Sequence, residues 1–261
     1  MPLLLTEIDQ RGVACLSLNN PERHNVFDDC LIGELTAELQ RLAGHSQVRV
    51  VVLTAIGKSF SAGADLNWMR RMADYTHSEN LRDAMALADL LETLNTMPQP
   101  TLARVQGAAF GGGVGLVAAC DIALASDRAS FCLSEVKLGL IPAVISPYVL
   151  AAIGERQARR YMLTAERFTA AEALRIGLIH QLCAADELAQ ETERICRQLL
   201  QNGPQALRET KRLIRDVAGK PIDHPLRALT AERIASARAS DEGRAGLSAF
   251  LHKQAPSWLK E

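Results

Sequence analysis

The chain has 261 residues, of which 48% are hydrophobic and 23% are charged, and its formal net charge is −1. This length and composition predict a globular protein with a full hydrophobic core, in one large domain or in a domain with an appendage. The nearly balanced charge excludes a bulk electrostatic attraction to nucleic acid or to an anionic membrane.

Targeting signals and cysteine spacing point to the same compartment. The first residues carry no basic segment before the three leucines, so we expect neither a signal peptide nor a transit peptide. No apolar run approaches the ~18 residues that a membrane span needs. The six cysteines are scattered, without a C-x-x-C pair or a zinc-like histidine spacing. We therefore expect a cytoplasmic protein with no disulfide framework and no metal site.

Strand patterns recur through the first half of the chain. Strand-like runs occur at residues 12–18, 48–54 and 101–106, and a further strand is expected at residues 121–125. The run at residues 48–54 is β-branched and shows no alternation of apolar and polar positions. That pattern predicts a strand that is buried on both faces.

Helix patterns separate these strands. A helix is expected over residues 31–42, with Asp28 or Asp29 as its N-cap, and a second over residues 79–97. A shorter helix is expected to begin near Asn67, where Asp65 can cap it. The residues expected to face the core on the second helix are Leu81, Met85, Ala88 and Leu91.

The last hundred residues read as helical throughout. The expected helices lie at residues 156–163, 170–176, 186–200, 204–217, 226–239 and 241–252. Alternating strands and helices followed by a helical tail predict an α/β fold with an all-helical appendage.

The glycine-rich turn near the middle of the chain is the most informative segment. Residues 107–121 read Gly-Ala-Ala-Phe-Gly-Gly-Gly-Val-Gly-Leu-Val-Ala-Ala-Cys-Asp. Their spacing fits neither a dinucleotide-binding fingerprint nor a P-loop. Glycine costs up to ~1 kcal/mol in a helix interior. A helix that begins this way therefore indicates either a ligand close to bare backbone N–H groups or tight helix–sheet packing.

A second turn of small residues precedes the glycine-rich one. Residues 61–66 read Ser-Ala-Gly-Ala-Asp-Leu and lead into an expected helix. Two such turns can direct two N–H groups at one oxygen. An oxyanion hole of this kind contributes ~3–4 kcal/mol per donor. The alternative is a capped turn with a structural role only.

Glu135 is the carboxylate that best suits chemistry. It lies in the otherwise apolar stretch Phe-Cys-Leu-Ser-Glu-Val at residues 131–136. A carboxyl group in such surroundings tends toward a raised pKa, which suits acid–base catalysis. The alternative is a salt bridge with Lys137 or an arginine. For Asp121, which follows the glycine-rich helix, we expect a structural hydrogen bond.

Taken together, these segments resemble the crotonase superfamily, and enoyl-CoA hydratases and isomerases in particular. The resemblance rests on residues 61–66, 106–113, 120–121 and 134–142 in this order, and it extends over nearly the whole chain. It implies a spiral of repeated β-β-α units over residues 1–197 and a helical trimerisation region over residues 198–261. It also implies an acyl-CoA thioester as substrate and no cofactor other than the coenzyme A of that substrate.

The resemblance assigns roles by position. The N–H groups of Ala64 and Gly112 would form the oxyanion hole, and Glu135 would be the catalytic carboxylate. Lys253 would reach coenzyme A on a neighbouring subunit of a homotrimer or a dimer of trimers. The set expected to bind substrate or coenzyme A comprises Arg23, His24, Ala62, Gly63, Asp65, Leu66, Gly111, Gly115 and Lys253.

One position departs from the family pattern. Typical hydratases of the family carry two catalytic glutamates, and Gly115 stands where the first of them is found. Residues 113–121, 133–140 and 142–149 are similar to bacterial hydratases of methylglutaconyl-CoA and isohexenylglutaconyl-CoA. We expect the missing side chain at Gly115 to open room beside the β-carbon and to remove a like charge from a substrate carboxylate. The sequence does not identify the cation that would pair with that carboxylate.

Three functions remain open at this point. The leading hypothesis is reversible hydration of a 3-substituted glutaconyl-CoA by Glu135 alone. The second is a double-bond isomerase in which Glu135 shuttles the proton. The third is a non-catalytic protein that binds a coenzyme A ester or RNA. RNA binding would use the basic helix that carries Arg208, Lys211, Arg212 and Arg215.

Overall fold

Two β-sheets form the centre of the molecule. A computed structural model describes residues 2–259. The main sheet has the strand order β1-β2-β3-β5-β7-β10, and the smaller sheet has the order β4-β6-β8-β9. β1 is antiparallel to β2 and β9 is antiparallel to β8, whereas the other neighbours are parallel. The strands are β1 (Leu4–Ile8), β2 (Val13–Leu18), β3 (Val50–Ala55), β4 (Ser59–Ser61), β5 (Thr101–Val105), β6 (Ala108–Phe110), β7 (Ile122–Ser126), β8 (Ser130–Cys132), β9 (Phe168–Thr169) and β10 (Gln181–Cys183).

Helices surround both sheets. Over residues 2–259, none of them is long and apolar enough to cross a membrane. The helices are α1 (Asp29–Ala43), α2 (Leu66–Ala73), α3 (His77–Thr96), α4 (Gly112–Ala119), α5 (Ser146–Thr164), α6 (Ala170–Ile176), α7 (Leu188–Leu200), α8 (Pro204–Val217), α9 (His224–Ala239) and α10 (Asp241–Leu251), with the short 3₁₀ helices η1 (Pro21–Arg23) and η2 (Glu135–Leu138).

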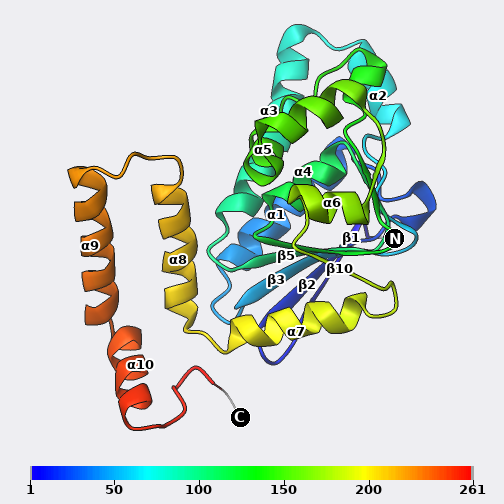
Figure 1. Cartoon of the computed structure of the whole chain (residues 1–261). Coiled ribbons are helices and arrows are strands. Elements are labelled where there is room, and N and C mark those ends of the chain that lie inside the picture. Colours follow the sequence, from blue (N-terminus) through cyan, green and yellow to red (C-terminus); the bar gives the residue numbers. More distant parts are fainter. Residues whose placement is uncertain (1, 260–261) are drawn as a thin grey trace.

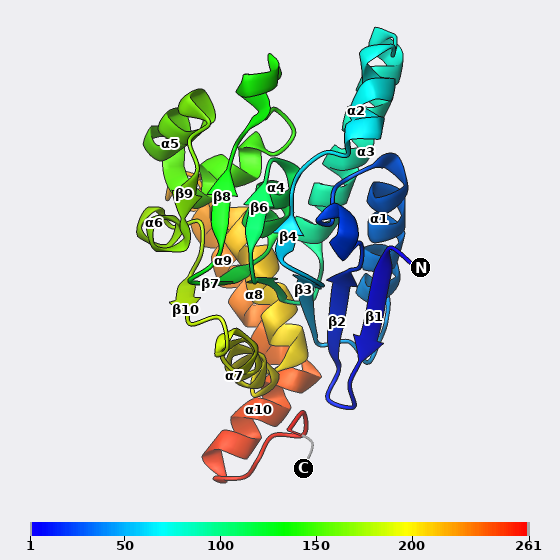
Figure 2. The same cartoon turned by 90° about the vertical axis from the view of Figure 1, so that its right-hand side faces the viewer.

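The elements repeat in a fixed order. β3, β5 and β7 of the main sheet are each followed by a short strand of the smaller sheet, namely β4, β6 and β8, and then by a helix. Figure 2 shows these three short strands side by side, next to the main sheet. The expected α/β spiral of β-β-α units is therefore confirmed.

The middle of the main sheet is covered on both faces. Val51 and Leu53 of β3 face the principal core, whereas Val50 and Val52 pack in a second cluster with Leu188 of α7. Alternate residues of a strand point to opposite faces, so both faces must be apolar here. The expectation of a strand buried on both sides is confirmed.

The inward face predicted for α3 is wrong in its first half. Leu81 and Met85 are exposed, whereas Leu90, Leu91 and Leu94 are buried. Figure 2 shows that the start of α3 extends beyond the core together with α2. The apolar periodicity therefore continues past the point where the core ends.

Some helix and strand boundaries also differ from those predicted from the sequence. The helix expected from residue 156 already begins at Ser146, and Gly154 interrupts it with a φ of 72°. The edge strands β1 and β10 were not among the expected elements. Both are short and lie at the two edges of the main sheet, where fewer apolar contacts constrain the sequence.

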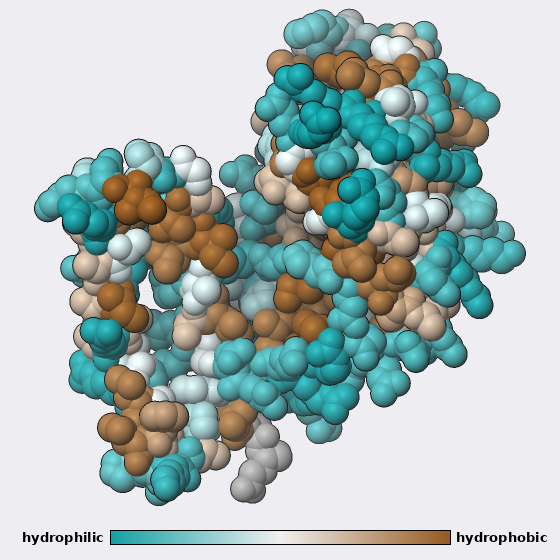
Figure 3. Space-filling model, viewed as in Figure 1, coloured by the Kyte–Doolittle hydropathy of each residue, from teal (hydrophilic) through white to brown (hydrophobic). Residues whose placement is uncertain are grey.

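The last three helices, α8 to α10, form an arm beside the core (Figure 1). Lys211 on α8 anchors it, since its Nζ donates to Asp121 Oδ2 at 2.6 Å and to the Gln99 carbonyl at 3.3 Å. No residue of these helices is buried, and Figure 3 shows apolar patches along the arm. The large apolar side chains exposed there include Ile214, Ile222, Ile234, Leu247, Phe250 and Leu251.

Candidate active site

The turn after β4 leaves one backbone donor free. Phe27 N donates to the Gly63 carbonyl at 2.7 Å, and Asp65 N donates to the Phe27 carbonyl at 2.7 Å. In this parallel bridge between Phe27 and Ala64, the N–H of Ala64 points away from Phe27. Within residues 2–259, no acceptor lies within hydrogen-bonding distance of that N–H.

The loop that holds this turn depends on a buried amide. Asn25 is fully buried and has a φ of 52°. Its Nδ2 donates to the carbonyls of Ile56 and Ser59 at 2.9 and 2.8 Å, and its Oδ1 accepts from Asn20 N at 2.8 Å. Next to Asn25, the His24 carbonyl accepts from Ala62 N at 3.0 Å, which joins this loop directly to the small-residue turn. The path of the small-residue turn is therefore fixed by residues distant in sequence.

Asp65 supports the turn from the other side. Its Oδ1 accepts from Asn67 N at 2.8 Å and from Trp68 N at 3.1 Å, which confirms the predicted N-cap of α2. Its Oδ2 pairs with the Arg23 guanidinium. Burial opposes the ionisation of Asp65, but the two backbone donors and Arg23 outweigh it, so the pKa of this carboxyl is lowered.

The glycine-rich turn supplies the second free donor. Gly111 has φ 52° and ψ −119°, and its N–H donates to the Cys132 carbonyl at 2.9 Å. Gly112 begins α4, and no acceptor in the described part of the chain lies within reach of its N–H. A Cβ at Gly113 would lie 3.0 Å from Ser61 Cβ. The turn therefore combines both expected functions, an open backbone donor and tight packing of α4 against β4.

Glu135 lies beside these donors at the start of η2. Its Oε1 is 3.2 Å from the position that a Cβ on Gly111 would occupy. Its Oε2 is buried and has no hydrogen-bond partner among the described residues. Burial raises the pKa of this carboxyl, against a smaller opposing effect of its own backbone N–H. The alternative of a salt bridge with Lys137 is not what the structure shows.

The residues that carry both donors and the carboxylate line one cavity of about 450 Å³. Glu135 is the only charged residue among the described residues that line it. The remaining wall is apolar or small, and it is built from Phe27, Ala62, Gly63, Ala64, Leu66, Trp68, Met69, Met72, Ala84, Leu87, Gly111, Gly112, Ser134, Leu138, Leu140, Ile141, Pro142, Ala143, Val144 and Ile145. A buried acid–base group next to two free N–H donors is an arrangement suited to thioester enolate chemistry.

The space expected at Gly115 is absent. Gly115 does not line the cavity, and a Cβ there would lie 2.4 Å from Ile145 Cγ2 and 3.1 Å from Ile145 Cβ. The Ile145 side chain therefore fills the volume that the sequence reading left open for substrate. This part of the prediction for Gly115 is wrong, because the filling residue is 30 positions away in sequence.

Other expected contact residues lie outside the cavity wall. Arg23 pairs with Asp65, and His24 Nδ1 lies 3.0 Å from Ser59 Oγ, so both are held on the loop behind the turn. The side chain of Asp65 faces its own helix, as described above. Lys253 follows the C-cap of α10, a helix that lies apart from α2 and α3 in Figure 1. Their roles toward coenzyme A stay predictions.

The helix α2 contributes wall residues that the sequence reading did not identify. Trp68, Met69 and Met72 line the cavity, and Trp68 Nε1 donates to Asp83 Oδ1 at 3.2 Å. The spacing of Trp68 and Met72 by one helical turn shows that they share a face. It is the only sequence signal that could have indicated them.

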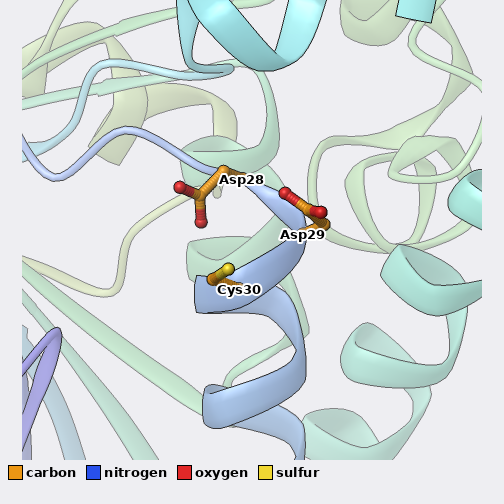
Figure 4. A group of neighbouring side chains, drawn as sticks. All are labelled: Asp28, Asp29 and Cys30. Carbon is orange, nitrogen blue, oxygen red and sulfur yellow. The ribbon is translucent and has the colours of Figure 1, made fainter. Parts of the chain in front are cut away.

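A group of potential metal ligands lies at the start of α1. The ligand atoms of Asp28, Asp29 and Cys30 are within 4.8 Å of one another (Figure 4). Asp28 Oδ1 accepts from Leu31 N at 2.8 Å as the N-cap, and Asp29 pairs with Arg71 at 2.5 Å. Helix capping and ion pairing therefore account for both carboxylates.

Known proteins are similar to this chain in fold and in sequence. The sequence model of the enoyl-CoA hydratase/isomerase family matches residues 8–261. An enoyl-CoA hydratase from Shewanella pealeana is 47% identical, with a TM-score of 0.96 over 98% of this chain and 96% of that one. AtuE from Pseudomonas aeruginosa is 36% identical, with a TM-score of 0.94 over 99% and 100%. Enoyl-CoA hydratase AKT6-1 from Alternaria alternata is 35% identical over 218 residues, which are 83% of this chain and 71% of that protein.

Fold, paired backbone donors and buried carboxylate together define a crotonase-type enzyme. The chain belongs to the enoyl-CoA hydratase/isomerase family. The sequence-based expectation is confirmed at this level, and the acyl-CoA substrate is implied by the family.

Proposed function

We propose that the protein adds water reversibly to the double bond of a 2-enoyl-CoA thioester and that Glu135 is its single acid–base residue. The observation that carries the proposal is the buried Oε2 of Glu135, which has no partner among the described residues, at a cavity that Ala64 and Gly112 also line with N–H groups for which no acceptor is found there. Those two donors would hold the thioester oxygen. The carboxylate would face the atoms that exchange protons.

The reaction follows from these positions. Ionised Glu135 takes a proton from water as the water oxygen bonds to C3, and the electron pair of the C2=C3 bond moves into the thioester to give an enolate. The N–H groups of Ala64 and Gly112 stabilise the enolate oxygen, at ~3–4 kcal/mol per donor. Protonated Glu135 then returns its proton to C2. One water has been added, and the carboxylate is regenerated.

The acyl group that we propose is a 3-substituted glutaconyl group, either methylglutaconyl or isohexenylglutaconyl. The resemblance of residues 133–140 and 142–149 to hydratases of these esters supports it. So does the charge of the cavity, since the described residues of its wall include one carboxylate instead of two. Two like charges 4 Å apart repel by about 1–4 kcal/mol between water and a protein surface. A second glutamate would therefore disfavour a substrate that carries its own carboxylate.

Substrate and mechanism can be tested together. We expect turnover of methylglutaconyl-CoA or isohexenylglutaconyl-CoA to exceed that of crotonyl-CoA at equal concentration. Glu135→Gln should abolish turnover and leave the dissociation constant of a saturated acyl-CoA nearly unchanged. Wild-type activity in Glu135→Gln would refute the mechanism, and a preference for crotonyl-CoA would refute the substrate.

Double-bond isomerisation is the second candidate, because one carboxylate suffices to move a proton between carbons. Incubation in ¹⁸O-labelled water followed by mass analysis separates the two reactions. Hydration yields a 3-hydroxyacyl-CoA with labelled oxygen, whereas isomerisation incorporates none. RNA binding is disfavoured, because Lys211 is turned inward to Asp121 and Arg212 pairs with Glu209 at 3.1 Å.

We also propose that residues 198–261 mediate assembly into a homotrimer or a dimer of trimers. The arm exposes many large apolar side chains, among them Phe250 and Leu251, and exposed apolar patches mark interaction surfaces. In such an assembly Lys253 would contact coenzyme A on a neighbouring subunit. Light scattering coupled to gel filtration should give three or six times the chain mass, and a monomer would contradict the proposal.

A further inference from the structure

Ile145 lines the cavity, and Gly115 lies directly behind it without lining the cavity itself. A Cβ on Gly115 would lie 2.4 Å from Ile145 Cγ2 and 3.6 Å from Leu91 Cδ1. Real Cβ atoms do not approach neighbours as closely as 2.4 Å. The Ile145 methyl group therefore sits in the notch that the absence of a side chain on α4 creates.

The other side of Ile145 lines the substrate cavity. Ile145 is 3% exposed and borders the cavity together with Ala143 and Val144. It immediately precedes α5, and its carbonyl accepts from Val149 N at 3.1 Å. The start of α5 thus fixes the backbone of Ile145, and the space beside Gly115 on α4 fixes its side chain. β-branching restricts its rotamer further.

We propose that Ile145 is a specificity-determining residue, seated on Gly115 so that an apolar wall packs against a substituent at C3 of the acyl group. The inference rests on the proposed function and deepens it. Ile145 closes the place where a side chain from position 115 would enter the cavity. A C3 substituent would therefore meet hydrocarbon at this wall, and among the described residues Glu135 is the only charged one that lines the cavity.

The specificity of Ile145→Ala distinguishes this role from simple packing. One methylene in an apolar pocket changes discrimination by about 10–200-fold. The ratio of kcat/KM for 3-methylcrotonyl-CoA to that for crotonyl-CoA should fall about 10-fold or more in Ile145→Ala. The matched control is Ile176→Ala, which removes the same atoms from a buried isoleucine of α6 outside the cavity. That control should leave the ratio at its wild-type value.

A second measurement does not depend on turnover. The dissociation constants of 3-methylbutyryl-CoA and butyryl-CoA, measured by titration calorimetry, should converge in Ile145→Ala by a similar factor. An unchanged ratio of these constants would overturn the role of Ile145, whether or not the protein catalyses hydration. If the wild-type protein turned over none of these thioesters but the ratio of dissociation constants shifted in Ile145→Ala, the proposed function would be overturned. Ile145 would then remain a wall of the acyl site.

The pairing with Gly115 is tested by a double-mutant cycle in thermal unfolding. Gly115→Ala should lower Tm in the wild-type background, because its Cβ collides with Ile145. In the Ile145→Ala background, which lacks Cγ2, the same substitution should lower Tm by less than half as much. Residues in contact couple in this way, whereas independent sites are additive. Equal losses in both backgrounds would refute the seating of Ile145 on Gly115.

Discussion

Two adjacent glycines of the glycine-rich turn should respond very differently to substitution by alanine. Gly111 has φ 52° and ψ −119°, where a side chain is strained, and its Cβ would lie 3.2 Å from Glu135 Oε1. Gly112 has helical geometry, and its Cβ would make an ordinary contact of 3.6 Å with the Phe27 ring. We therefore expect Gly111→Ala to be strongly destabilising and Gly112→Ala to be nearly neutral.

The magnitude follows from the backbone. A residue held in a sparsely populated conformation costs about 1–3 kcal/mol. In a chain of this size, 1 kcal/mol corresponds to about 2–4 °C in Tm. Gly111→Ala should thus lower Tm by about 2–12 °C. Gly112→Ala loses nothing of this kind, and at the first position of α4 it gains only a fraction of the ~1 kcal/mol by which alanine exceeds glycine in a helix interior.

Calorimetry and steady-state kinetics check the two variants. Gly111→Ala should also reduce kcat/KM by about 10-fold or more, because displacement of a catalytic group by a fraction of an ångström is costly. If Gly112→Ala destabilised the protein as much as Gly111→Ala, the assignment of strain to Gly111 alone would be refuted.

Three further predictions concern charged groups. The raised pKa of Glu135 should place the acid limb of the kcat/KM profile above the ordinary glutamate range, because activity is lost when the base is protonated at low pH. An acid limb at the ordinary glutamate pKa would contradict this expectation. Lys211→Met should cost about 1–3 kcal/mol in chemical denaturation through its bond to Asp121, whereas Arg212→Met on the exposed face should cost less than about 0.5; equal costs would exclude the anchor. Asp65→Ala should lower stability by about 0.5–2 kcal/mol through loss of the α2 cap, and an unchanged Tm would rule that cap out.

The sign of the Glu135 effect on stability is opposite to that of a salt-bridged carboxylate. Because burial raises its folded-state pKa, the contribution of Glu135 favours the folded state below the ordinary glutamate pKa. That contribution is lost as pH rises through the folded pKa. At neutral pH, Glu135→Gln should therefore be at least as stable as the wild type.

Local composition marked the segments that line the cavity, but the roles predicted for Ala64, Gly112 and Glu135 came only with the family resemblance. The turns at residues 61–66 and 107–115 each show an unusual density of small residues before a helix, and their donors line one cavity. Glu135 was recognisable because a carboxylate in an apolar stretch is rare. These features are encoded within a few residues, so no knowledge of the fold was needed to suspect them.

Contacts between segments that are distant in sequence cannot be predicted from local composition. Gly115 looked like open space because nothing in its own segment indicates that Ile145 fills it. Leu81 and Met85 share an apolar face, but periodicity cannot show where the core ends. The wall formed by Trp68 was missed for a related reason, since an aromatic side chain on a helix face is as typical of a core as of a cavity.

The candidate site consists of backbone donors and of side chains that line the cavity, and these two parts can evolve separately. Substitutions other than proline cannot remove the N–H groups of Ala64 and Gly112, because those groups belong to the backbone path. If these N–H groups hold the thioester oxygen as proposed, a descendant of this chain could exchange the side chains around the acyl group and keep that contact. A new reaction on a coenzyme A ester would then require a change at Glu135 or in the cavity wall near it, whereas the two backbone donors would stay unchanged.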